Sequence, residues 1–280
     1  PYLGPGVPVV HRGGLLVHSL LMLNAGGDCC TDLNMLHAAE GVLGDVGSDT
    51  TFRRMVADFT NTSGTTAGVD EAFREIRTRV WADHGWSDPD RRVILDIDAT
   101  LTPVHSEKED AKGNYKRGFG FHPVACFADC SGEALAIDHR PGNAGANTIT
   151  DLVGIVDAGL DALPDSVARS HRPGAIADEA TNELLVRSDS AGHTSGFLWD
   201  MWGRNVRFCV TGRSNSTLSS AILGFGDNTN WQAALRPRNV DSDSDPDVDA
   251  RAAQVVEITN YPTIAKWLGL KGRPKDNLDV

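Results

Sequence analysis

The chain has 280 residues, a formal net charge of −12, 40% hydrophobic residues and 23% charged residues. It is long enough for one large core or two smaller domains, and its composition is ordinary for a globular protein. No apolar run approaches the 18 residues of a membrane span, so we expect no membrane partner.

The acidic balance argues against a nucleic-acid partner, because phosphate neutralisation by Lys and Arg supplies most of the affinity for DNA. Part of the negative charge is local, since every second residue from Asp241 to Asp249 is an aspartate. The five cysteines form no even disulfide framework, so we expect reduced thiols of a cytosolic protein.

Residues 1–90 are expected to be helical. Apolar residues recur at helical spacing in residues 18–23, 32–39, 51–59 and 70–82, and Ser48 offers an N-cap for the third segment. The last segment carries Val69, Phe73, Ile76 and Val80 on one face. We therefore expect a small helical region ahead of a linker at 85–92.

The helices on either side of the turn at Gly47 and Ser48 are compatible with a DNA-binding helix-turn-helix as well as with plain packing. Arg53 and Arg54 lie on the early turns of the second helix of this pair. They are therefore candidate DNA contacts.

From residue 92 the pattern changes to that of short strands. We expect strands at 93–100, 119–128 and 133–139, a helix at 148–163, a strand at 184–190, a helix at 194–204 and a strand at 206–211. A tight turn at 129–132 joins the second and third strands into a hairpin. The helical crossover makes the first and fourth strands adjacent and parallel.

Aspartates lie at the ends of these two strands. The first strand contains Asp96 and Asp98, and the fourth ends at Asp189. Parallel neighbours would bring Asp98 and Asp189 to one edge of the sheet, where two carboxylates need a cation between them. A lone strand-end aspartate would more often cap a turn, so the D-x-D spacing carries this prediction of an Mg²⁺ site.

Longer motifs extend over most of the chain: LDIDATL, VHSEKE, YKRGFGFHP, LAIDHRPGNAGANT and VRSDSAG, preceded by GPGVP, LLMLNAGGDCCTDL and SDTTFRR. They resemble insertion-sequence transposases of the DDE class, most closely the insertion-sequence family known as thirteen-eighty. The resemblance implies an α/β fold with an RNase H-like mixed five-stranded sheet and flanking helices in residues 91–215. A small helical domain (1–90) would precede it, and an incomplete β-rich insertion (216–280) would follow.

The resemblance also implies the chemistry. The family's first aspartate lies in a D-x-T arrangement, here Asp98, and its second lies in a DSAG turn, here Asp189. Both would be catalytic and would hold Mg²⁺ or Mn²⁺ while water, and then a freed 3′-OH, attacks a DNA phosphodiester. Asp96 lies on the same face of its strand as Asp98 and could act as an outer-shell ligand.

The resemblance implies as partners the terminal inverted repeats of the element and its target DNA, with a homodimer in the synaptic complex. The location would be a prokaryotic cytoplasm, at the nucleoid. Lys116 and Arg117 precede the second strand beside the expected site. We expect them to contact phosphate, the alternative being solvated loop charges.

The family's third acidic residue has no counterpart in the chain. It is a glutamate on a helix with Tyr-x2-Arg-x3-Glu spacing, whereas the only glutamate after Asp189 is Glu257, in a strand-like segment without that spacing. We expect the chain to end before this helix. The alternative is a decayed copy of the element.

Two other functions stay open. A catalytically inactive DNA-binding transposase remnant would fit the absent glutamate. A haloacid-dehalogenase-type phosphatase would use Asp96 as nucleophile and Asp98 as acid/base, since DIDATLT matches its D-x-D-x-T motif. That fold expects a helix directly after the first strand, where this sequence predicts a hairpin.

Overall fold

The computed structural model describes residues 11–61, 65–105, 108–145, 148–175, 182–212, 216–224, 232–233 and 254–255. Its first elements are α1 (Arg12–Asn24), the 3₁₀ helix η1 (Cys30–Ala39), α2 (Glu40–Leu43) and α3 (Asp49–Asn61). They enclose a small apolar cluster that includes Leu15, Leu33 and Met55. The hydroxyl of Ser48 accepts a hydrogen bond from the Thr51 N–H at 3.2 Å, so the predicted N-cap is confirmed.

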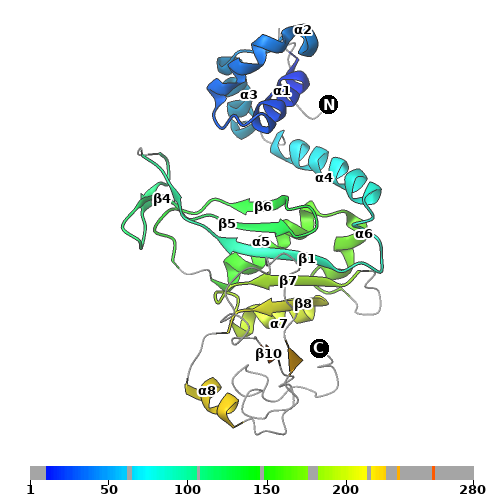
Figure 1. Cartoon of the computed structure of the whole chain (residues 1–280), viewed down its shortest axis with the longest axis vertical. Helices are drawn as coiled ribbons and strands as arrows, with labels where there is room; N and C mark the ends of the chain where they lie inside the picture. Colours follow the sequence, from blue (N-terminus) through cyan, green and yellow to red (C-terminus); the bar gives the residue numbers. More distant parts are fainter. Residues whose placement is uncertain are drawn as a thin grey trace, which may run out of the picture.

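Helix α4 (Thr65–Asp83) runs from the N-terminal helices to the sheet (Figure 1). Its last turns are anchored by fully buried Trp81, whose Nε1–H donates to Glu133 Oε1 at 2.8 Å. Arg77 donates to Glu133 Oε2 at 2.9 Å and to the carbonyl oxygen of Ala162 at 2.7 Å. This anchor joins the helix to the turn before β6 and to the end of α5, two elements described below.

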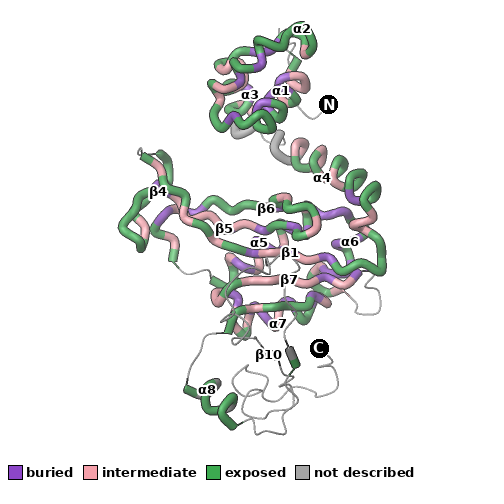
Figure 2. The backbone as a smooth tube through the Cα atoms, viewed as in Figure 1, coloured by how far each residue is buried: buried purple, intermediate pink, exposed green. Residues whose placement is uncertain are grey.

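The apolar stripe predicted on α4 does not face a core. Phe73, Ile76 and Val80 are exposed, and most of α4 is open to solvent in Figure 2. The reason is that the helix contacts the sheet domain through the side that carries Arg77 and Trp81, two residues that the predicted stripe does not include.

The central sheet has the order β6-β5-β1-β7-β8. Its strands are β1 (Val93–Ala99), β5 (Val124–Ala128), β6 (Ala134–Asp138), β7 (Leu184–Ser188) and β8 (Val206–Val210). β1, β7 and β8 are parallel, whereas β5 is antiparallel to both β1 and β6. The RNase H-like mixed five-stranded sheet predicted from the sequence is confirmed, including the parallel pairing of its first and fourth strands.

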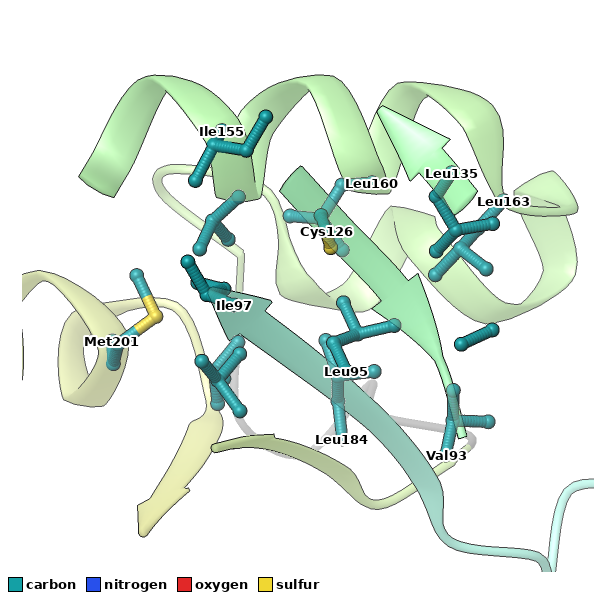
Figure 3. Packing of buried hydrophobic residues seen from close by; sticks show 14 of the residues in the cluster. Val93, Leu95, Ile97, Cys126, Leu135, Ile155, Leu160, Leu163, Leu184 and Met201 are labelled. Atoms are coloured by element: carbon teal, nitrogen blue, oxygen red, sulfur yellow. The ribbon is translucent and has the colours of Figure 1, made fainter. Parts of the chain in front are cut away.

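One face of the sheet is covered by α5 (Ile149–Ala162) and α7 (Ser195–Gly203), with the short α6 (Asp165–Ala168) and η2 (Arg169–His171) between them in sequence. Alternate strand residues such as Leu95, Ile97 and Cys126 pack beneath α5 (Figure 3). Thr148 caps the start of α5, and its hydroxyl accepts a hydrogen bond from the Asp151 N–H. The residues between these core positions face the opposite side of the sheet.

The strand predicted at 119–128 is two strands. β4 (Phe119–Phe121) belongs to a separate sheet of order β2-β4-β3, with β2 (Thr102–Pro103) and β3 (Lys112–Gly113). The break lies at His122 and Pro123, where the His122 N–H bonds to Arg140 and proline has no N–H for a ladder. The first strand is thus followed by small β elements and not by a helix.

The elements described after β8 are the helix α8 (Ser216–Leu223) and two antiparallel strands, β9 (Gln232–Ala233) and β10 (Gln254–Val255). Glu257 and the loop from Asp241 to Asp249 lie outside the described residues. The β-rich insertion and the domain boundaries at 90 and 215 therefore stay predictions. Among the helices described, none combines the length and hydropathy of a membrane span.

Candidate active site

Asp98 and Asp189 both lie at the carboxyl edge of the sheet. β1 and β7 pair in parallel up to Ile97 and Ser188; Asp98 is the next residue of β1, and Asp189 is the first residue after β7. Neighbouring strands are about 4.8 Å apart. Residues 91 positions apart in the sequence, both exposed, therefore share one end of the sheet.

Each of these carboxylates is held by one main-chain donor. Asp98 Oδ1 accepts from the Ala99 N–H at 2.9 Å, and Asp189 Oδ1 accepts from the Ala191 N–H at 2.9 Å in the turn that follows β7. Neither carboxylate forms an ion pair with any residue that the structure describes. Each therefore presents an oxygen that is available to a hard cation.

The residues immediately before this pair form an ion-paired triad that the sequence did not reveal. Arg187, on β7, donates from Nε and Nη2 to the two oxygens of Asp96, on β1, each at 2.6 Å. Its Nη2 also donates to Asp129 Oδ1 at 2.6 Å, in the turn after β5. These hydrogen bonds, with Asp96 first, raise the pKa of Arg187. The triad thus links β5, β1 and β7. Asp96 and Arg187 lie two residues before Asp98 and Asp189, respectively.

The triad engages both carboxylate oxygens of Asp96. Both oxygens accept hydrogen bonds from the guanidinium group of Arg187 in a bidentate pair, which orients β7 against β1. The R-x-D spacing of Arg187 and Asp189 mirrors the D-x-D spacing of β1, and this was the signal in the sequence that could have suggested the pairing.

The four predicted DNA-contacting residues fall into two separate places. Lys116 and Arg117 lie at the tip of the β3–β4 hairpin, in the segment that links β1 to β5 at the edge carrying Asp98. Arg53 and Arg54 are exposed on α3, in the helical region that α4 separates from the sheet (Figure 1). Arg53 lies 3.6 Å from Asp49 on its own helix. The structure therefore associates the first pair, but not the second, with the strand-end aspartates.

One other group of residues has the composition of a metal site. Asp28, Cys29 and Asp32 are the only three described His, Cys, Asp or Glu residues whose ligand atoms all lie within 4.8 Å of one another. Asp32 Oδ2 accepts from the N–H groups of Asp28 and Cys29, each at 3.0 Å, which lowers the pKa of Asp32. These hydrogen bonds cap η1, and the group has a structural role.

The comparison with family models adds a finding independent of this geometry. Residues 8–253 match the family described as transposase DDE domain group 1. The chain belongs to this DDE transposase family. A comparison with curated protein sequences finds no match, and membership in the thirteen-eighty group stays a prediction.

Solved structures of the Mos1 transposase are similar to this DDE transposase at low identity. The Mos1 mariner paired-end complex with Mn is 9% identical, with 79% of this chain and 67% of that chain covered and a TM-score of 0.26. The pre-cleavage Mos1 transpososome is 11% identical, with 95% and 73% covered and a TM-score of 0.27.

The phosphatase alternative conflicts with the site. Its nucleophile would be Asp96, whose two oxygens both accept hydrogen bonds from Arg187. Its fold would also place a helix after β1, where this DDE transposase has the three small strands that precede β5. Asp98 and Asp189, unlike Asp96, form no ion pair with a described residue.

Proposed function

We propose that this DDE transposase catalyses divalent-cation-dependent cleavage and strand transfer of the DNA of its own insertion sequence, with Asp98 and Asp189 as its first two catalytic residues. The observation that carries the proposal is the parallel register of β1 and β7, which makes the two carboxylates neighbours at one edge. Family membership supports the reaction class.

Asp98 and Asp189 would hold Mg²⁺ or Mn²⁺. Their fit to such a cation rests on hard oxygen donors, exposure, and the absence of a competing cationic partner among the described residues. A bound cation there supplies stabilisation of charge on the attacking and leaving oxygens of a phosphodiester. The chain's own contribution is to orient the carboxylates through the N–H groups of Ala99 and Ala191, and to neutralise Asp96 with Arg187 so that it does not compete.

The DNA partner would be the element's terminal inverted repeats and its target, bound by a homodimer that holds two ends together. Lys116 and Arg117 would contact backbone phosphate near the scissile bond, and Arg53 and Arg54 would contact DNA from the helical region. All four are exposed cations. Because the protein as a whole has a net charge of −12, attraction of the DNA phosphates must come from local groups of positive charge such as these.

The test separates metal binding from catalysis. Mn²⁺ bound by the full chain is measured by electron paramagnetic resonance, and nicking of a supercoiled plasmid is measured with Mg²⁺ or Mn²⁺. Asp98→Ala and Asp189→Ala should each weaken Mn²⁺ binding at least tenfold and abolish any nicking. Asp138→Ala is the matched control, since Asp138 ends β6 at the same edge but β5 separates it from β1. Unchanged Mn²⁺ binding in either aspartate variant refutes the site.

A DNA-binding remnant without activity is a second candidate. It is favoured by one observation: among the described residues no third carboxylate joins Asp98 and Asp189 in a metal-ligand cluster. A wild-type chain that binds Mn²⁺ and DNA but never nicks would support this candidate.

A further inference from the structure

The β3–β4 hairpin, residues 112–121, ends in a turn that a single side chain organises. Asn114 Oδ1 accepts from the N–H groups of Lys116 at 3.0 Å and Gly118 at 2.9 Å. The Asn114 N–H donates to the carbonyl oxygen of Gly118 at 2.8 Å and closes the loop. Three successive side chains, Tyr115 to Arg117, are therefore presented on a turn of fixed shape.

One of these residues is in a backbone conformation that does not suit it. Arg117 has a φ of 65°, the left-handed region that short hairpin loops usually give to glycine. The sequence places Gly118 immediately after this position. Folding alone would favour glycine at this position, so Arg117 is a candidate for a role in binding.

The charge around the hairpin is unlike that of the rest of the chain. Lys108, Lys112 and Lys116 are the only lysines before residue 266. They and Arg117 form no ion pair with a described residue, whereas buried arginines such as Arg140 and Arg204 are paired with aspartates. Within residues 112–121 the hairpin carries three cations, Lys112, Lys116 and Arg117, and no acidic residue, whereas Glu109 and Asp110 precede it in a protein of net charge −12.

An aromatic ring lies among these charges. Tyr115 is 73% exposed, next to Lys116 whose Nζ lies 5.7 Å from the ring centre. The His122 ring lies 6.1 Å away, tilted against Tyr115. A large exposed ring bordered by cations is the combination that binds single-stranded nucleic acid, because a base stacks on the ring while phosphates meet the charges.

The base of the hairpin is closely packed. A Cβ on Gly120 would lie 2.1 Å from the carbonyl oxygen of Thr102, and one on Gly142 would lie 2.3 Å from that of Lys112. β2, which begins at Thr102, lies only four residues after Asp98 in the sequence. The base of the hairpin therefore packs against the segment that follows β1 at the candidate catalytic edge.

We propose that this hairpin grips the DNA end that is being processed, with Tyr115 stacked on an unpaired base and with Lys116 and Arg117 on the flanking phosphates. The inference rests on the proposed function for the presence of DNA and adds which element holds it and in what form. Stacking requires an unpaired base, because bases inside a duplex already stack on each other. The hairpin should therefore favour DNA with a single-stranded tail over a blunt duplex.

The first test compares two probes, a short mixed-sequence duplex with a single-stranded tail and the same duplex with blunt ends. Binding to the full chain is followed by fluorescence anisotropy in EDTA, so that it does not depend on the cation site. Tyr115→Ala should weaken binding of the tailed probe by about tenfold and remove the preference for it. Tyr115→Phe should retain both, and Phe73→Ala, which truncates an exposed ring on α4, should change neither.

The second test uses the strain at Arg117. Arg117→Gly should raise the midpoint of urea unfolding, because glycine suits the left-handed position, while it weakens DNA binding and lowers the salt dependence by about one phosphate contact. Arg79→Gln removes an exposed arginine of α4 and is the control. A purely structural Arg117 would give increased stability with unchanged DNA binding, and that result overturns the proposal.

The two proposals fail in different ways. Normal Mn²⁺ binding at Asp98 and Asp189, together with tailed-DNA affinity that the Tyr115 and Arg117 variants leave unchanged, refutes the hairpin alone. Loss of the tail preference in Tyr115→Ala by a protein that binds no Mn²⁺ supports the hairpin and refutes the catalytic site.

Discussion

Helix α5 carries two glycines in contrasting surroundings, and they make a matched pair of alanine substitutions. Gly159 is buried against β5, where a Cβ would lie 2.7 Å from Cys126 Sγ and 3.4 Å from Cys126 Cβ. Gly154 is exposed, and a Cβ there would meet no atom within 4 Å. Cys126 lies beneath α5 beside Leu160 in Figure 3. The comparison therefore measures how closely the helix is fitted to the strand next to β1.

The expected magnitudes follow from two opposing effects. Both substitutions gain about 1 kcal/mol of helix propensity over glycine. Nothing opposes that gain at Gly154, so Gly154→Ala should raise the free energy of unfolding by about 0.5–1 kcal/mol. At Gly159 the new methyl group lies roughly 1 Å inside normal contact distance, and such overpacking costs about 1–3 kcal/mol. Gly159→Ala should therefore lie about 1–3 kcal/mol below Gly154→Ala in stability.

Urea unfolding followed by circular dichroism measures both variants, with Cys126→Ala as the third member of a double-mutant cycle. Burial first, and then the charge of Asp96, raises the pKa of the Cys126 thiol to about 12, so it is neutral in the assay and the cycle reports packing. Removing Sγ should recover most of the loss in Gly159→Ala. Equal stability of the two alanine variants, or no coupling between positions 126 and 159, would refute the reasoning.

Two further predictions concern charged and titrating groups. Arg187→Met should lower the free energy of unfolding by about 1–2 kcal/mol, because Asp96 and Asp129 lose the cation that they share. The control is Arg207→Met on the same face of the sheet, which should lower it by less than about 0.5 kcal/mol. Equal losses of the two variants in urea unfolding would contradict the triad. His171 is fully buried between the carbonyl oxygens of Asn182 and Asn205, and burial lowers its pKa from the ordinary 6.5. The free energy of unfolding should therefore keep the full contribution of the neutral ring above pH 6.5 and should decrease as the pH falls below that value. A His171→Gln variant should lose this dependence, and a wild-type stability that rises on acidification would show instead a charged ring bridging both carbonyls.

Local signals in the sequence predicted most of the secondary structure. The alternation of Leu95 and Ile97 with Asp96 and Asp98 defined β1 and both of its faces, and the cap at Ser48 set the start of its helix. These features depend on hydrogen bonds between residues a few positions apart, which is why they can be read from the chain. The prediction at 119–128 was wrong because the apolar pattern continues through Pro123, and only the missing N–H marks the break.

The parallel pairing of β1 and β7 was also predictable, since a helical crossover between two strands leaves few alternatives. This predicted pairing is enough to place Asp98 and Asp189 at the same edge of the sheet. The exact partner of Arg187 was not predictable, because Asp96 lies 91 positions away and Asp129 lies 58 positions away. Which carboxylates an arginine reaches depends on the register of three strands together.

The sequence by itself determined the family, the order of strands and helices, and the two aspartates that meet at the end of the sheet, because each follows from short-range pattern or from a single crossover. The tertiary structure decided which carboxylates are free and which are neutralised, and it presented Tyr115, Lys116 and Arg117 on a turn that Asn114 closes, in the segment between β1 and β5. The physical reason is that ion pairing and exposure are set by contacts between distant segments, whose geometry exists only once the strands are in register.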